Sequence, residues 1–441
     1  MDLSSAKIKV NRWFIIFLVG ICLGTAYEAP YIRYNFHEAL IVIMGYTNTQ
    51  LGVMLSVYGT LALGCYLIGG IIADRFPCRN VITISAIGTA LGCVVMAFYP
   101  PYPIALAIEA FWVLTTIMLL WSPAQKVGSL LSTKNDEGKV LPMLSSFEGV
   151  GAFVSTFICI TVFCRIGAEQ NPNSMRYIWL IYATILFICG IMTFLIIPSK
   201  ALREDGASDS AVQMEAKKNK KNMGGTLGKV LKNPATYAAG FLVLGAYMAY
   251  ACLTYTQSYL VHNFGWDMSD AAIISIIRNQ GVRIISGPLA ALFVAIPIFK
   301  NKATRLNIVI SSVCIAGFVI LLILPTKLNM LATIIVLMIF LALVNFIARS
   351  QAFACAYETG IDVKYFGTLS GVVSLIGYSS DAWIYILIGH WQDTLEAPLA
   401  YNRIWYLALF GCILAAISGF CLIALRRKNS TVKSINVSSA S

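Results

Sequence analysis

Seven ionisable side chains interrupt the long apolar stretches of this 441-residue chain, and they are the first candidates for chemistry. A charged group at bilayer depth costs a few kcal/mol on insertion scales, so such groups usually line a polar cavity and pair with one another. Four of the seven are acids and three are bases, so we expect a nearly neutral, paired interior. The seven are Glu28, Arg33, Glu109, Glu148, Arg278, Arg283 and Asp381.

The two arginines of one stretch differ in their expected roles. Arg278 lies nine residues into its apolar stretch, which is about 13 Å along a helix and close to the middle of a bilayer. Arg283 follows five residues later and would point about 140° away on an α-helix. We predict that Arg278 binds the substrate, with a fixed salt bridge as the alternative, and that Arg283 is a candidate for a structural pair.

The acids have three possible roles. Glu28, Glu148 and Glu109 are candidates for proton coupling, because a carboxylate in an apolar cavity can load and release a proton near neutral pH. Asp381 is a candidate for substrate binding. For each of them the alternative is a fixed salt bridge between helices, and the sequence leaves both open.

Tyrosines are concentrated beside these charges. Tyr27 and Tyr31 share a helical face near Arg33, while Tyr247 and Tyr250 begin a polar stripe further along the chain. Their hydroxyl groups are suited to donate hydrogen bonds to a polar solute. The alternative is an interfacial aromatic belt, which we favour for Tyr259, Tyr401 and Tyr406.

The elements that must position these residues are membrane helices. Hydrophobic residues make up 58% of the chain and charged residues 12%, against about a quarter charged in soluble domains. The segment after Arg12 lacks a cleavage site and is expected to be the first span. Twelve stretches are long enough to cross a bilayer: 12–36, 47–72, 80–99, 103–127, 140–164, 177–198, 235–262, 269–298, 305–325, 329–353, 366–389 and 402–425.

A long polar segment divides these stretches into two sets of six. We predict an all-α membrane protein with a six-helix half over 1–198, a cytoplasmic linker over 199–233, a second half over 234–428 and a cytoplasmic tail over 429–441. Of the 32 Lys and Arg residues, 25 would face the side of the N-terminus, four the other side, and three lie within spans. This asymmetry predicts cytoplasmic termini.

Several classes of protein are excluded by the same pattern. The net charge of +12 follows the loops of one side and forms no basic domain surface, so we expect no nucleic-acid partner. The cysteines are scattered without a CxxC pair, which favours buried apolar roles. No catalytic arrangement, metal cluster or nucleotide-binding loop is evident, so we expect no enzyme activity and no cofactor.

One string is specific enough to suggest a family. Gly70-Ile71-Ile72-Ala73-Asp74-Arg75, followed by the basic turn to Arg79, resembles the loop 2–3 signature of the major facilitator superfamily, although Pro77 replaces a usual glycine. The resemblance implies two six-helix halves and a conformational latch formed by Gly70, Asp74, Arg75 and Arg79. In that motif the glycine allows close helix packing.

A second string is narrower. Arg33-Tyr34-Asn35-Phe36 resembles the R-x-N-F string of the organophosphate:phosphate antiporter branch, in which the arginine contacts the substrate anion. That branch pairs it with an arginine in helix 7, whereas residues 235–262 contain no arginine or lysine here. The family's helix 5 histidine position holds Glu148. The resemblance therefore implies a divergent bacterial relative of that branch with another substrate.

Together these patterns predict a secondary transporter of the bacterial inner membrane. We expect it to move a small polar solute, with Arg33 and Arg278 favouring a sugar acid, sugar phosphate or other carboxylate. We expect a proton or another ion as the coupling partner, the lipid bilayer as surroundings, and a monomer. The alternatives are an exporter of drugs or amphiphiles, and a transporter-like solute sensor.

Overall fold

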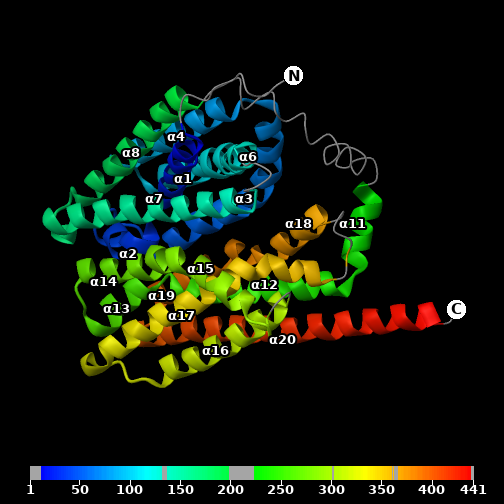
Figure 1. Cartoon of the computed structure of the whole chain (residues 1–441). Coiled ribbons are helices and arrows are strands. Elements are labelled where there is room, and N and C mark those ends of the chain that lie inside the picture. The colour runs from blue at the N-terminus through cyan, green and yellow to red at the C-terminus, as the bar shows by residue number, and fades with distance from the viewer. Residues whose placement is uncertain are drawn as a thin grey trace. The chain divides into compact units, whose positions relative to one another are not determined.

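A computed structural model describes residues 11–131, 137–197, 223–299, 302–359, 361 and 366–438 of the chain, and these residues form helices and no strands (Figure 1). The chain divides into two compact units. Unit 1 comprises the described residues of Met1–Ala211 together with Trp266–Ile284 and Tyr385–Asp393. Unit 2 comprises those of Val212–Gly265, Ile285–Ile384 and Thr394–Ser441.

Unit 1 is built mainly from the first half of the chain. Its core includes the stacked rings of Trp112 and Trp179, whose centroids are 5.6 Å apart. Its α-helices are α1 (Arg12–Glu28), α2 (Arg33–Val42), α3 (Asn48–Arg75), α4 (Cys78–Met96), α5 (Tyr102–Trp112), α6 (Ser122–Leu130), α7 (Glu137–Arg165), α8 (Ser174–Ile196), α14 (Met268–Ile276) and most of α19 (Ile384–Thr394). A π-helix over Val113–Trp121 joins α5 to α6.

Unit 2 is built around α12 and α20. An added Cβ at Gly245 would clash with the carbonyl oxygen of Gly411, so the two backbones are in direct contact. The α-helices of this unit are α11 (Met223–Lys232), α12 (Pro234–Leu253), α13 (Thr256–Phe264), most of α15 (Val282–Ala295), α16 (Ala303–Ile323), α17 (Leu331–Ala352), α18 (Phe366–Gly377) and α20 (Ala397–Ser438).

The short helices complete the two units. Unit 1 also contains a 3-10 turn over Ala168–Gln170 and a π-helix over Ile277–Gly281. Unit 2 contains 3-10 segments over Leu328–Met330, Phe353–Thr359 and Ser379–Ala382.

Among the described residues, nine helices are long and apolar enough to cross a membrane, and each matches one predicted span. The other three predicted spans are also helical: they correspond to α3, to α14 through α15, and to α18 through α19. Residues 198–222, which include most of the predicted linker, lie outside the described part, and α11 occupies the rest of it. α20 continues as a helix through the start of the predicted tail.

The helix ends follow local chemistry. Thr47 and Gln50 form a capping box at the start of α3, with side chain and backbone bonded in both directions. Asn233 caps α12 by accepting a hydrogen bond from the Ala235 amide at 3.0 Å, and Pro234 occupies the first helical position.

Several predicted continuous spans are broken beside the charged residues. α1 ends at Glu28 and α2 begins at Arg33, with a turn between them. Arg278 lies inside a π-helix, and Asp381 lies inside a 3-10 segment. Such breaks free backbone polar groups and re-aim side chains, and they are typical of functional regions. The sequence marks these places with Pro30 and with the polar runs Arg278-Asn279-Gln280 and Ser379-Ser380-Asp381, although the predicted spans ran through them unbroken.

Candidate functional site

In unit 1, Arg33 lies against aromatic rings at the break between α1 and α2. Its side chain is buried, and its guanidinium carbon is 5.2 Å from the ring centroid of Tyr34 and 4.8 Å from that of Tyr385. The hydroxyl groups of these two tyrosines are hydrogen-bonded at 3.0 Å. Rings at these distances hold a guanidinium by cation–π attraction.

The predicted tyrosines Tyr31 and Tyr27 continue from the ring of Tyr34, which contacts Arg33. The Tyr31 ring stacks on Tyr34 at 5.2 Å and meets Tyr58 edge-on at the same distance. Tyr27 is one turn further away, 6.5 Å from Tyr31 between ring centroids. Its buried hydroxyl oxygen has no hydrogen-bond partner among the described residues. The structure therefore gathers Tyr27, Tyr31 and Arg33 in one region of unit 1.

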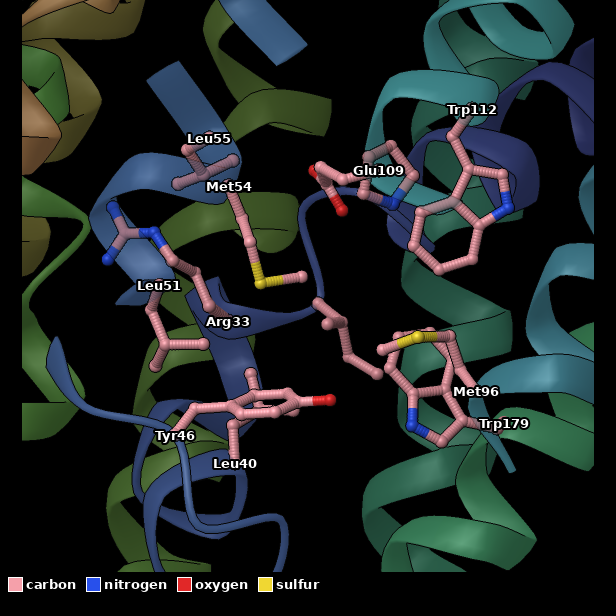
Figure 2. A pocket seen from close by; sticks show the side chains of 12 residues that line it. Arg33, Leu40, Tyr46, Leu51, Met54, Leu55, Met96, Glu109, Trp112 and Trp179 are labelled. Carbon is pink, nitrogen blue, oxygen red and sulfur yellow. The ribbon is translucent and has the colours of Figure 1, made fainter. Parts of the chain in front are cut away.

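A small pocket in unit 1 brings Arg33 and Glu109 to one space (Figure 2). Its volume is about 20 Å³, which is room for about one water molecule. Figure 2 shows the two side chains on different walls with the Met54 thioether in view between them, and Trp112 and Trp179 on a further wall. Glu109 is buried, and its Oε1 atom has no partner within the described part of the chain.

Glu28, at the end of α1, is the centre of a buried hydrogen-bond network. Its carboxylate accepts bonds from Thr156 Oγ1 at 2.7 Å, from Asn35 Nδ2 at 3.3 Å, and from the Gln280 amide. These three donors are all neutral, so each stabilises the charge without cancelling it. The donors come from α7, α2 and the π-helix that holds Arg278, which makes the network sensitive to the positions of all three.

Glu148 forms an ion pair. Arg283 donates to its Oε1 atom at 2.5 Å, and the Glu148 side chain is buried while that of Arg283 is 37% exposed. Gly24 sets this position, because an added Cβ there would clash with the Glu148 carbonyl oxygen and push α1 away from α7. The structure thus gives Arg283 the structural pair that the sequence suggested for it.

Arg278 is completely buried in unit 1. One Nη atom donates to Ser275 Oγ at 3.4 Å, and that serine donates to the Tyr34 carbonyl oxygen at 2.5 Å. The 140° separation expected between Arg278 and Arg283 assumed an unbroken α-helix, and this assumption does not hold because Ile277–Gly281 is a π-helix. Its i to i+5 hydrogen bonds add a residue to the turn, which brings residues five apart closer to one face.

In unit 2 a second arginine lies on the tyrosine stripe. The guanidinium carbon of Arg349 is 3.8 Å from the Tyr250 ring centroid and 5.2 Å from that of Tyr247. Tyr247 donates its hydroxyl to Asp381 Oδ2 at 3.0 Å and meets the Tyr378 ring edge-on at 4.9 Å. The structure thus brings Tyr247, Tyr250 and Asp381 together, and we call these residues with Arg349 and Tyr378 the Arg349 cluster.

Sequence reasoning missed Arg349. Although it lies within the predicted span 329–353, we counted it with the charges on the side of the N-terminus and not among the seven charges within spans. In the structure it lies in α17 with its side chain over two rings of α12. α12, the first helix of the predicted span 235–262, has no arginine of its own, and α17 supplies Arg349 to its tyrosines. The belt role expected for Tyr259 and Tyr401 is also wrong, since both are buried against each other in unit 2. Tyr406 is 59% exposed.

The loop 2–3 motif lies at the end of α3. Arg75 is exposed, and Arg79 places its guanidinium carbon 4.6 Å from the Phe194 ring centroid. The Asp74 side chain lies outside the described residues. The close packing expected at Gly70 is wrong, because an added Cβ there would meet no atom within 4 Å. An added Cβ at Gly69 would lie 2.8 Å from the Met118 carbonyl oxygen. The close contact between helix backbones therefore occurs at Gly69 and not at Gly70.

Comparison with known proteins gives consistent results. Inner membrane protein YqcE of Escherichia coli is 28% identical over 412 residues, covering 93% of this chain and 95% of YqcE. Inner membrane protein YihN of the same organism is 24% identical over 404 residues, covering 90% and 91%.

The fold resembles those of solved transporters. The nucleoside transporter NupG has a TM-score of 0.69 at 14% identity, covering 94% of this chain and 99% of that one. A D-xylose-proton symporter has a TM-score of 0.67 at 14% identity, covering 93% and 96%. At this identity the likeness concerns the fold alone. The model of the Major Facilitator Superfamily matches residues 13–382, and the chain therefore belongs to this family of membrane transporters.

Proposed function

We propose that this transporter moves a small, polar, anionic organic solute by alternating access, driven by a proton gradient. The solute is a sugar acid, a sugar phosphate or a carboxylate. The observation that carries the proposal is that each unit holds a buried or half-buried arginine on tyrosine rings: Arg33 in unit 1 and Arg349 in unit 2. Stacking leaves the edge of a guanidinium suited to bind carboxylate or phosphate through two parallel hydrogen bonds.

The two arginines also support a position near the organophosphate and organic-anion branch of the family. The sequence departs from that branch because the seventh predicted span, 235–262, has no arginine. Arg349 offers an equivalent charge from α17. It lies at a different place in the sequence but contacts the rings of Tyr247 and Tyr250 on α12.

Proton coupling is supported by the acids of unit 1. Glu28 is surrounded by neutral donors, and Glu109 has an oxygen without a partner among the described residues. Glu148 is paired with Arg283, so its protonation would break an ion pair and release that arginine. A carboxylate that changes its partners is a physical means of linking proton loading to movement.

The membrane and the orientation follow from the relatives and from charge. YqcE and YihN are inner membrane proteins by name, which supports the bacterial inner membrane for this chain. The asymmetry of Lys and Arg supports cytoplasmic termini. The motif over Gly70, Asp74, Arg75 and Arg79 would then lie on the cytoplasmic side and act as a latch in one conformation.

The test is a ligand screen followed by transport. Purified protein is screened by thermal shift against sugar acids, sugar phosphates, carboxylates and lipophilic cations. Uptake of the stabilising compounds into proteoliposomes is then measured with and without a pH gradient. Removing a charged hydrogen-bond partner costs about 1.5–3 kcal/mol, so Arg33→Ala and Arg349→Ala should each weaken solute binding by about 10- to 100-fold.

The matched control is Arg165→Ala, which removes an exposed arginine at the end of α7 and should leave binding unchanged. If lipophilic cations alone stabilise the protein and Arg33→Ala is tolerated, the chain is an exporter of amphiphiles. Binding without uptake under any gradient would point to a solute sensor.

A further inference from the structure

The Arg349 cluster contains a carboxylate as well as a guanidinium. Asp381 uses Oδ2 to accept the Tyr247 hydroxyl, and its Oδ1 atom is buried without a hydrogen-bond partner among the described residues. The neighbouring Ser380 Oγ atom is also buried without a hydrogen-bond partner among the described residues. Both residues lie in the 3-10 segment over Ser379–Ala382, where the break between α18 and α19 turns the chain.

A third buried acceptor belongs to Asn345, which is bonded to the same helix, α12. Asn345 is one turn before Arg349 on α17, and its Nδ2 atom donates to the Ala246 carbonyl oxygen at 3.1 Å. Its Oδ1 atom is buried and has no partner in the described part of the chain. Asn345 and Asp381 are therefore both bonded to α12, at the neighbouring residues Ala246 and Tyr247.

Arg349 and the oxygen acceptors of Asp381, Ser380 and Asn345 would favour some anions over others, according to how many hydrogen-bond donors the anion carries. Arg349 offers donors to one anionic group, and the surrounding acceptors are oxygen atoms that need donors, because a buried polar atom without a partner is unfavourable. A sugar hydroxyl supplies such a donor, whereas an ionised phosphate or a second carboxylate brings further acceptors. When ionised, the Asp381 carboxylate also disfavours a second negative charge on the solute.

We propose that the Arg349 cluster binds sugar acids with a single negative charge, with Arg349 on the carboxylate and Asp381 accepting a hydroxyl group. This assignment rests on the proposed transport of anions and narrows it to one class. Asp381 is then a specificity-determining residue: it favours hydroxylated monoanions and disfavours sugar phosphates and dicarboxylates.

The first test uses the unmodified protein. Binding of D-gluconate, D-galacturonate, D-glucose 6-phosphate, malate and D-glucose to purified full-length protein is measured by thermal shift and by calorimetry at neutral pH. We expect a sugar acid to bind at least about ten-fold more tightly than the phosphate or the dicarboxylate, a ratio equal to about 1.4 kcal/mol. Equal or tighter binding of D-glucose 6-phosphate or malate overturns the proposal.

The second test changes the discriminating group. Asp381→Asn should weaken binding of the sugar acid and strengthen binding of the phosphate, so that the ratio between them falls by about ten-fold or more. Tyr247→Phe removes the hydroxyl that holds Asp381 but keeps the charge, and should reduce the same ratio by a smaller factor. The control is Glu358→Gln, which removes an acid of unit 2 that pairs with Arg426 and should leave the ratio unchanged.

The outcomes separate this inference from the proposed function. If phosphates or dicarboxylates bind best, or if Asp381→Asn leaves the ratio unchanged, the sugar-acid assignment is wrong while anion transport stands. If no anion binds and lipophilic cations do, both are wrong. The comparison in the unmodified protein decides the class even if a variant fails to fold.

Discussion

Asp393 offers a prediction whose size can be worked out from the geometry of unit 1. Its carboxylate lies at the start of α3, where Oδ1 accepts the Asn48 amide at 3.0 Å and Asn48 Nδ2 at 2.9 Å, and Oδ2 accepts the Thr49 amide at 2.7 Å. A carboxylate at this place satisfies free amides and the positive end of the helix dipole. Since Asp393 lies on α19, this cap joins two segments more than 300 residues apart in sequence.

The expected cost of Asp393→Asn is modest. Replacing a capping residue by alanine costs about 0.5–2 kcal/mol. Asparagine keeps one of the two acceptor oxygens, and Asp393 is exposed to screening by water and ions, so the lower part of this range applies. We take about 0.5–1 kcal/mol, which corresponds to a two- to five-fold rise in opening of the first turn of α3. Hydrogen exchange of the Asn48 and Thr49 region, followed by mass spectrometry, measures this opening.

The pH dependence of the same contact has a definite sign. Burial alone would raise the pKa of Asp393, but the hydrogen bonds from Thr49 and Asn48 outweigh it and lower the pKa below its ordinary value. The contribution of the cap is therefore complete at neutral pH and is lost as the pH falls through this lowered pKa. In the Asp393→Asn variant, protection of α3 should not respond to acid in this way once intrinsic exchange rates are corrected.

A matched control is available in the same unit. Asp267 caps its own helix, α14, by accepting the amides of Ser269 at 2.8 Å and Asp270 at 3.1 Å. Asp267→Asn should leave exchange at the start of α3 unchanged. If Asp393→Asn also leaves it unchanged, or if both variants raise it equally, then the carboxylate of Asp393 does not hold α19 against α3.

Three further predictions concern the interior of unit 1. Arg283→Leu leaves Glu148 buried without its ion pair and should destabilise the protein by about 1–2 kcal/mol, allowing for the partly exposed guanidinium; Glu148→Gln in the same chain should restore part of the loss in a thermal melt. Gly24→Ala forces α1 from α7 and should cost about 1–3 kcal/mol, whereas Gly70→Ala meets open space and should leave the melting temperature unchanged or slightly raised. Glu28→Gln should abolish accumulation driven by a pH gradient while solute exchange between the two sides of a proteoliposome continues; gradient-driven accumulation at the normal level would remove Glu28 from proton coupling.

Much of the fold could be predicted because the bilayer imposes a local rule. A helix must be apolar over about 20 residues to cross the hydrocarbon region, so hydropathy located the spans without knowledge of their packing. Proline and asparagine at positions such as Asn233-Pro234 marked the interruptions for the same local reason. The charged residues were also visible from the sequence, since an ionisable side chain in an apolar stretch is conspicuous wherever it later lies.

The partners of those residues were only partly predictable. Arg283 was expected to form a pair, but its partner could not be identified from the sequence. The partner is Glu148, 135 residues earlier, because α7 packs beside the start of α15. The polar run Arg278-Asn279-Gln280 marks the position of the π-helix in the sequence, but a polar run alone does not specify a π-helix. It arises from how the chain packs around polar side chains, and it invalidated an angle that assumed regular geometry.

Arg349 and Gly69 show most clearly where sequence information ends. Arg349 was counted with the charges on the side of the N-terminus, and only the packing of α17 beside α12 places it on Tyr250. The motif drew attention to Gly70, but the contact between backbones occurs at Gly69. The sequence by itself determined which segments cross a membrane and which residues are charged, because both depend on composition within one helix. The tertiary structure decided which of those residues meet, because a contact between helices depends on the rotation and depth of each, which hydropathy within a single helix leaves undetermined.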